Sequence, residues 1–76
     1  MPTLARLPNA SLTMYAADHL PPHFHVRMTD GREALVEVAT LTVLTGSVPK
    51  RELAAALAWA AANRALLHAK WKELNP

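Results

Sequence analysis

Three of the four histidines in this chain lie within a seven-residue stretch that also contains a Pro-Pro pair. His19 precedes Pro21 and Pro22, and His23 and His25 follow them. Each proline fixes its own φ angle, and the second proline pushes the first toward an extended conformation. The pair is therefore a stiff connection that holds His19 at a defined place relative to the other two histidines. If the chain carries out chemistry, we expect it here.

The residues after the diproline alternate between polar and apolar side chains, which is the pattern of a half-buried β-strand. The apolar set, which we expect to face a core, is Phe24, Val26 and Met28. The polar set, on the opposite face, is His23, His25 and Arg27. Tyr15 ends an earlier alternating segment and is expected on the polar side. The sequence thus predicts a sheet face that carries titratable and cationic side chains.

The first interpretation of the three histidines is structural. Imidazoles on a half-exposed sheet face can hydrogen-bond to Glu37, to Asp18 or to the backbone, and for any single histidine this interpretation is favoured. The grouping of three histidines beside a diproline weakens it without excluding it.

The second interpretation is a metal site. His23 and His25 share one strand face, and His19 can fold back over them. Glu37 or Asp18 can supply a further, oxygen ligand. Three protein ligands plus a water molecule make the arrangement of a catalytic zinc site. Because His-x-His spacing is frequent by chance and the sequence identifies no outer hydrogen-bond partner, no metal ligand is assigned and the cofactor is left open.

The third interpretation is acid–base chemistry without a metal. Histidine titrates near neutral pH, so an imidazole paired with a second one or with Glu37 can accept and donate protons. Arg27 beside them can stabilise the charge that develops on a phosphate group. Together with Tyr15, these residue types can support RNA cleavage through the ribose 2′-hydroxyl.

Other common kinds of active site lack support in the sequence. There is no cysteine, which excludes a disulfide framework and a thiolate metal site. The serines lie in turn-like positions without a nucleophile motif, and the isolated Gly31 and Gly46 do not make a phosphate-binding loop. The net charge of +2 is too small to indicate nucleic-acid binding on its own.

The elements that must position the histidines are short strands. Alternation and turn residues predict strands over residues 3–7, 11–15, 23–28 and 32–38, with an edge strand or extended lead-in over 41–44. A three-residue turn over 29–31, with Gly31 left-handed in a bulge, keeps the two faces of the third and fourth strands in register. The predicted pairs are Val26 with Ala34, Phe24 with Val36, Arg27 with Glu33, and His23 with Glu37. A slip of one residue would bury charges.

From about residue 48 to about residue 74 the sequence predicts one long helix. Pro49 suits its first turn, and no strong helix breaker follows. About 25 residues with a rise of about 1.5 Å each make a rod about 38 Å long. The apolar stripe, interrupted by Arg64, consists of Leu53, Leu57, Ala60, Leu67, Trp71 and Leu74. We expect the last turns to overhang the sheet and to offer a surface to another chain.

Together these elements predict a single α+β domain. An antiparallel sheet of four or five strands occupies residues 1–46, and one long C-terminal helix over 48–74 packs across one face. A core built from 76 residues is marginal, so we expect a homo-oligomer, formed through the long helix, or a partner to complete it. No stretch approaches the ~20 apolar residues of a membrane span, and the N-terminal residues lack the layout of a signal peptide. We expect a cytoplasmic protein that does not bind membranes.

The string His-x-Pro-Pro-His-x-His-Val over residues 19–26 resembles the motif of a family of very small bacterial proteins, the domain of unknown function 4160 family. The resemblance covers nearly the whole chain and includes Met1-Pro2-Thr3, Tyr15, Gly46, Pro49-Lys50, Trp59, Asn63, Leu67 and Trp71. Genes of that family commonly lie beside a second small gene, in pairs that look like type II toxin–antitoxin modules. The resemblance therefore implies a toxin-like protein with a small cognate antitoxin-like partner.

The leading hypothesis is accordingly a toxin-like protein that acts on RNA through its histidine-rich sheet face. The candidate catalytic residues are His19, His23, His25, Arg27 and Tyr15. The alternative is a non-enzymatic interaction or regulatory module with structural histidines, or a small metal-binding protein with histidine ligands. The candidate residues for binding a partner are Trp59, Asn63, Leu67 and Trp71.

Overall fold

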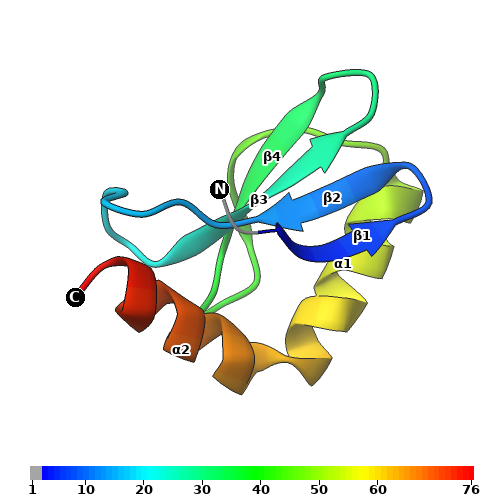
Figure 1. Ribbon diagram of the computed structural model, residues 1–76. Helices are drawn as coiled ribbons and strands as arrows, with labels where there is room; N and C mark the ends of the chain where they lie inside the picture. The colour runs from blue at the N-terminus through cyan, green and yellow to red at the C-terminus, as the bar shows by residue number, and fades with distance from the viewer. Residues whose placement is uncertain (1–2) are drawn as a thin grey trace.

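Five strands followed by two helices make up residues 3–76, the part of the chain that the computed structural model describes (Figure 1). The strands are β1 (Thr3–Leu7), β2 (Ala10–Thr13), β3 (His23–Met28), β4 (Glu33–Glu37) and β5 (Val43–Gly46). The helices are α1 (Lys50–Ala62) and α2 (Arg64–Leu74). The strands form one antiparallel sheet in the order β1-β2-β3-β4-β5, which confirms the predicted α+β fold. Met1 and Pro2, the start of the predicted sheet region, lie outside the described residues.

The register between β3 and β4 is the one that the sequence predicts. The paired residues are His23 with Glu37, Phe24 with Val36, Val26 with Ala34, and Arg27 with Glu33. The turn that joins β3 and β4 depends on Gly31, whose φ of 98° is one that residues with a Cβ rarely adopt. Its N–H donates to the carbonyl of Met28 at 3.0 Å. The polar residues of β3 therefore share one sheet face, as expected.

The edge strand β5 runs over Val43–Gly46 instead of 41–44, so Gly46 ends the strand and lies opposite Ala34. Gly46 has a φ of 79°. A Cβ at this position would collide with the carbonyl oxygen of Glu33. Because β5 approaches β4 this closely, the position requires glycine.

The prediction of one long helix is wrong, because the chain leaves the helical conformation at Asn63. This residue has φ −125° and ψ 28°, and its N–H donates to the Ala60 carbonyl at 3.1 Å. Its side-chain Nδ2 donates to the Trp59 carbonyl at 2.8 Å, the oxygen that residue 63 would bond through its backbone N–H in a continuous helix. The bend also keeps both helices against the sheet (Figure 1). A straight rod of about 38 Å would exceed the longest dimension of the molecule, 32 Å.

The core lies between one face of the sheet and the two helices. Its sheet residues include Leu12, Met14, Phe24, Val26, Val36 and Val38, all with no measurable exposure. Its helix residues are Ala56, Ala60, Leu67 and Trp71, with Leu53, Leu57, Trp59 and Leu74 half-buried around them. Most of the predicted apolar stripe is therefore confirmed, and the small Ala56 joins it where α1 approaches the sheet. Within residues 3–76, none of the helices combines the length and the apolar character that crossing a membrane requires.

Candidate functional site

The connection between β2 and β3, residues 14–22, carries Asp18 and His19 to the beginning of β3. Three contacts hold this connection in place. Pro22 accepts the backbone N–H of Val38 through its carbonyl at 3.0 Å, which fixes the diproline to the end of β4. The backbone N–H of Asp18 donates to Oδ1 of Asn75 at 2.8 Å. The N–H of Ala17 donates to the Leu74 carbonyl at 3.4 Å, so the end of α2 secures the loop.

His23 is the most enclosed of the three histidines, with only 1% of its surface exposed. The strand register places it on the polar face, where the His19 ring from the 14–22 connection and the Trp71 ring from α2 lie close to it. Its ring lies 4.9 Å from the His19 ring and 5.3 Å from Trp71, centroid to centroid. Its Nδ1 lies 2.8 Å from the carbonyl oxygen of Pro21. That carbonyl only accepts, so Nδ1 carries the hydrogen and Nε2 is the free nitrogen of the neutral ring.

His25 lies between two carboxylates. Its Nε2 is 3.4 Å from Oδ2 of Asp18, and its Nδ1 is 3.3 Å from Oε2 of Glu33. The ring of Tyr15 meets it edge-on, with centroids 4.4 Å apart and planes at 82°. The side chain retains 13% exposure, so His25 is at the margin of the solvent.

Asp18 is the residue that joins the histidines. Its Oδ2 lies 3.0 Å from Nε2 of His23, and its Oδ1 accepts the backbone N–H of His19 at 2.9 Å. Partial burial acts to raise the pKa of this carboxyl. The hydrogen bonds from the His19 backbone and the His25 ring, with the nearby imidazoles, outweigh burial and lower the pKa below its ordinary value of 3.8. Asp18 is therefore a carboxylate at neutral pH.

Buried polar atoms without a hydrogen-bond partner gather in this part of the molecule. Among the described residues these atoms are Thr13 Oγ1, His23 Nε2 and His25 Nδ1. Carboxylate oxygens lie 3.0 Å from the second atom and 3.3 Å from the third. Each oxygen lies off the direction in which the ring nitrogen's hydrogen or lone pair points, so the atoms are close without forming a hydrogen bond. Thr13 is paired with His25 across β2 and β3, which places its side chain on the same face.

Asp18, His23 and His25 can together hold a metal ion. Each offers a ligand atom, and these atoms all lie within 4.8 Å of one another. The other acidic candidate, Glu37, accepts a hydrogen bond from the Thr40 hydroxyl at 2.9 Å instead. His19, whose side chain is 72% exposed, lies beside the group with its Nε2 3.7 Å from Asp18. The same residues can also exchange protons with a substrate, so the geometry is compatible with both kinds of chemistry.

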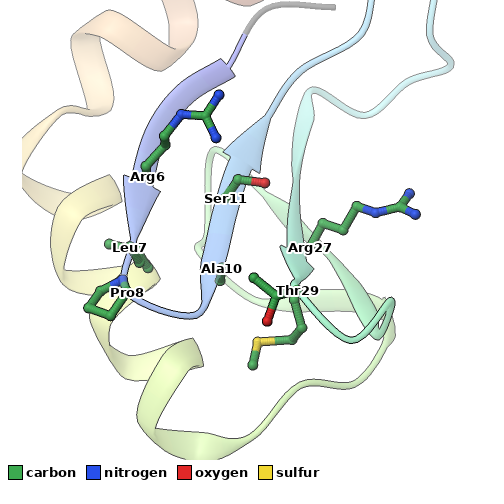
Figure 2. Close-up of a pocket in the computed structure, with 8 residues that line it drawn as sticks. Arg6, Leu7, Pro8, Ala10, Ser11, Arg27 and Thr29 are labelled. Carbon is green, nitrogen blue, oxygen red and sulfur yellow. The ribbon is translucent and has the colours of Figure 1, made fainter.

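A row of polar side chains continues the site along the same sheet face. Arg27 lies two residues beyond His25, Ser11 pairs with Arg27, and Arg6 pairs with Ser11. These residues lie on three adjacent strands and border a hollow of about 390 Å³ (Figure 2). Both arginines are exposed, and neither has an ion-pair partner within residues 3–76. We call Arg6, Ser11 and Arg27 the arginine row.

The structure brings together most of the residues predicted from the sequence. His19, His23 and His25 meet around Asp18, Tyr15 packs against the His25 ring, and Arg27 lies at the edge of this group. The sequence indicates Asp18 only as one possible hydrogen-bond partner or oxygen ligand, although its place directly before His19 is a usable signal. Glu33 and Arg6 were missed as site residues. Both follow from the strand register. Glu33 is the diagonal neighbour of His25, which a long side chain can reach, and Arg6 pairs with Ser11, which in turn pairs with Arg27.

The four candidate residues for partner binding differ in burial and in their place in the fold. Leu67 and Trp71 are buried in the core, with 0% and 7% exposure. Trp59 is half-buried against that core, and Asn63 makes the bend between the helices. Their role in binding a partner stays a prediction.

Comparison with known proteins gives one match. A family model described as domain of unknown function (DUF4160) matches residues 10–72, a span that contains the histidine string and most of both helices. No curated protein and no solved structure matches the chain.

Proposed function

The chain belongs to the DUF4160 family, and we propose that it is the toxin-like component of a bacterial two-gene module that acts on RNA in the cytoplasm. The observation that carries this proposal is the position of the arginine row beside the histidine site. His25 and Arg27 project from the same face of β3, so titratable groups and unpaired cations lie next to each other. RNA carries a negatively charged phosphate at every nucleotide and a reactive 2′-hydroxyl beside it. It therefore suits a face on which cations and titratable groups are neighbours.

The arginine row supplies phosphate contacts. A guanidinium binds phosphate oxygens through parallel hydrogen bonds, which a lysine ammonium does not. Arg6 and Arg27 stand on either side of Ser11, on β1 and β3. Adjacent strands lie about 4.8 Å apart, so the two arginine backbones are separated by about 10 Å, within reach of neighbouring phosphates.

The histidine site supplies proton transfer. His19 is the exposed imidazole and is the residue able to touch a substrate directly, with Asp18 3.7 Å away to orient it. Tyr15 is half-buried against His25. His23 is buried, so in this proposal it positions Asp18 and does not contact RNA.

The proposed partner is a small cognate antitoxin-like protein that covers this face. Leu20 lies next to His19 on the same loop and is 75% exposed. An exposed apolar side chain beside a polar site is a suitable anchor for a neutralising partner.

A growth assay tests the proposal. The wild-type chain, expressed in bacteria without the neighbouring small gene, is expected to inhibit growth, and co-expression of that gene is expected to relieve the inhibition. His19→Ala should abolish inhibition, because it removes the accessible imidazole from an exposed position. His68→Ala, which removes the exposed histidine of α2, is the matched control and should remain toxic. If the His19→Ala protein is folded and inhibits growth as the wild type does, the proposed function is wrong.

A second candidate function is a non-enzymatic interaction module, favoured by the edge of the sheet. Val43 and Leu44 on the edge strand β5 are 39% and 42% exposed. An uncovered edge with apolar side chains can pair with a strand of a second copy or of another protein. Leu44→Lys should then convert an oligomer to monomer in size-exclusion chromatography, whereas a monomeric wild type would remove this candidate. Trp71 variants do not serve here, because that side chain is part of the core.

A further inference from the structure

We propose that Asp18, His23 and His25 form a binding site for a divalent transition-metal ion, with zinc as the first candidate. The proposal concerns the residues of the histidine site but does not rest on action upon RNA. It rests on the positions of the ligand atoms, on the contacts of the second nitrogen in each ring, and on a buried nitrogen without a hydrogen-bond partner.

The ligand atoms already have almost the spacing that a metal requires. Around a tetrahedral zinc ion, with ligands about 2.1 Å from the metal, neighbouring ligand atoms lie about 3.4 Å apart. Oδ2 of Asp18 is 3.0 Å from Nε2 of His23 and 3.4 Å from Nε2 of His25. All three ligand atoms lie within 4.8 Å of one another. The spacing of the ligand atoms therefore departs from that of a tetrahedral site by no more than about 1.4 Å.

His23 is oriented through the ring nitrogen that would not bind the metal, and in His25 the corresponding nitrogen lies near a carboxylate. His23 donates from Nδ1 to the Pro21 carbonyl at 2.8 Å. Nδ1 of His25 lies 3.3 Å from the Glu33 carboxylate without a hydrogen bond, and this carboxylate could accept its hydrogen once Nε2 binds the metal. A backbone carbonyl or a carboxylate on the distal nitrogen is the usual arrangement for histidines that bind metals, because it fixes the tautomer and the ring direction. Both rings thus present Nε2 toward Asp18.

The free nitrogen of His23 is an independent observation. The residue is 99% buried, from its 1% exposure, and Nε2 has no hydrogen-bond partner among the described residues. A buried polar atom left without a partner is unfavourable, because it has lost its hydrogen bonds to water. A metal ion on the lone pair of this nitrogen would satisfy it, and Asp18 lies beside that lone pair, where a second ligand belongs. If His23 were only structural, a hydrogen bond along the direction of its Nε2 lone pair would be expected. Asp18 does not make this bond.

The donor set indicates which ions the site takes. Two imidazole nitrogens and one carboxylate suit zinc, iron(II) or cobalt(II) and do not suit magnesium, which prefers oxygen ligands only. Three protein ligands leave a coordination position open, as in catalytic zinc sites. His19 is exposed and lies beside two of the proposed ligands, Asp18 and His23.

The test is a metal titration of the full-length, untagged protein. After chelation and dialysis, Zn²⁺ is added in a calorimeter, and Co²⁺ is added while its visible absorption is recorded. We expect one ion per chain, an absorption of four- or five-coordinate cobalt, and no heat from Mg²⁺ at the same concentrations. A protein that binds no Zn²⁺, or that binds Mg²⁺ equally well, would overturn the proposal.

Variants locate the ion. His25→Ala and the nearly isosteric Asp18→Asn should each abolish stoichiometric binding, whereas His68→Ala should bind as the wild type does. Because His23 is buried and its variants risk unfolding, they are not needed for the assignment. Glu33→Gln keeps all three ligands and should weaken Zn²⁺ binding by about 10–100-fold. Circular dichroism confirms that each variant is folded, and equal binding by His25→Ala and His68→Ala would assign the ion elsewhere and refute the site.

Failure of the metal site and failure of the proposed function give different experimental results. If Zn²⁺ binds and Asp18→Asn abolishes binding while growth inhibition is unaffected, the metal site stands and the RNA-directed function fails. If no ion binds while His19→Ala abolishes growth inhibition, the function stands and the metal site fails.

Discussion

The backbone N–H of Asp18 donates a hydrogen bond of 2.8 Å to the side chain of Asn75, a residue 57 positions further along the chain. This contact connects the last turn of α2 to the loop that carries the central carboxylate of the site. Asn75 also donates from Nδ2 to the Tyr15 and Trp71 carbonyls, at 3.4 Å and 3.3 Å. The bend at Asn63 therefore has a consequence for the site, because it directs α2 so that its end reaches Asp18.

Asn75→Ala should loosen the site more than the fold. We expect a loss of about 1 kcal/mol in the free energy of unfolding, the typical value of a hydrogen bond, and about 10-fold weaker Zn²⁺ binding. Urea denaturation and calorimetry measure the two effects. Asn9→Ala, in the exposed turn between β1 and β2, is the control and should change neither. Unchanged Zn²⁺ affinity in Asn75→Ala would show that α2 does not position Asp18.

Gly46→Ala should destabilise the protein more than Gly31→Ala. Both glycines have positive φ angles, which cost a residue with a Cβ about 1–2 kcal/mol. A Cβ at Gly31 meets no atom within 4 Å, whereas at Gly46 it collides with the Glu33 carbonyl. Urea denaturation of the two variants makes the comparison, and equal losses would contradict the close approach of β5 to β4.

Asn63→Ala should destabilise the protein although alanine is the better helix former. The substitution removes the bond from Nδ2 to the Trp59 carbonyl, and we expect a loss of about 1 kcal/mol in the free energy of unfolding. Thermal and urea denaturation provide the measurement. A stabilised variant would mean that the chain tolerates a continuous helix, contrary to the bend seen here.

The turn between β3 and β4 should weaken in acid. The side chain and backbone N–H of Arg32 donate to Asp30, at 2.8 Å and 3.0 Å, and lower the pKa of this carboxyl below 3.8. Its contribution to stability is therefore fully present above pH 3.8 and is lost as the pH falls through the lowered value. In an NMR titration, Arg32→Gln should raise the pKa of Asp30 toward 3.8, and an unchanged pKa would show that the pair does not form in solution.

The arginine row should control the salt dependence of RNA binding. Arg6→Gln and Arg27→Gln are each expected to weaken binding of single-stranded RNA and to reduce the slope of log K against log salt by about 0.7. Fluorescence anisotropy at several salt concentrations gives the slopes. Arg64→Gln, exposed on α2, is the matched control. Equal slopes for all three variants would remove the arginine row from the proposed RNA contact.

The sheet could be predicted from the sequence because its determinants are local. Alternation of Phe24 and Val26 with His23 and His25 defines the two faces, and the turn before Glu33 sets the register. The bend could not be predicted by the same means. It depends on a side chain competing with the backbone at Asn63, a residue that helices also tolerate in their interior.

The histidine grouping could be predicted, but its centre could not. His23 and His25 share a strand, so their proximity follows from the period of two residues. The position of Asp18 depends on contacts with the end of α2, which the sequence does not reveal until the bend is known. The burial of His23 has the same cause, since α2 places Trp71 against its ring.

Cleavage of single-stranded RNA by the purified protein tests the central claim most directly. The wild type and His68→Ala should cleave it at the same rate. Asp18→Asn and His19→Ala, with circular dichroism like that of the wild type, should have lost this activity. Cleavage by Asp18→Asn at the wild-type rate would contradict the account, because the carboxylate that joins the three histidines would then have no part in the reaction.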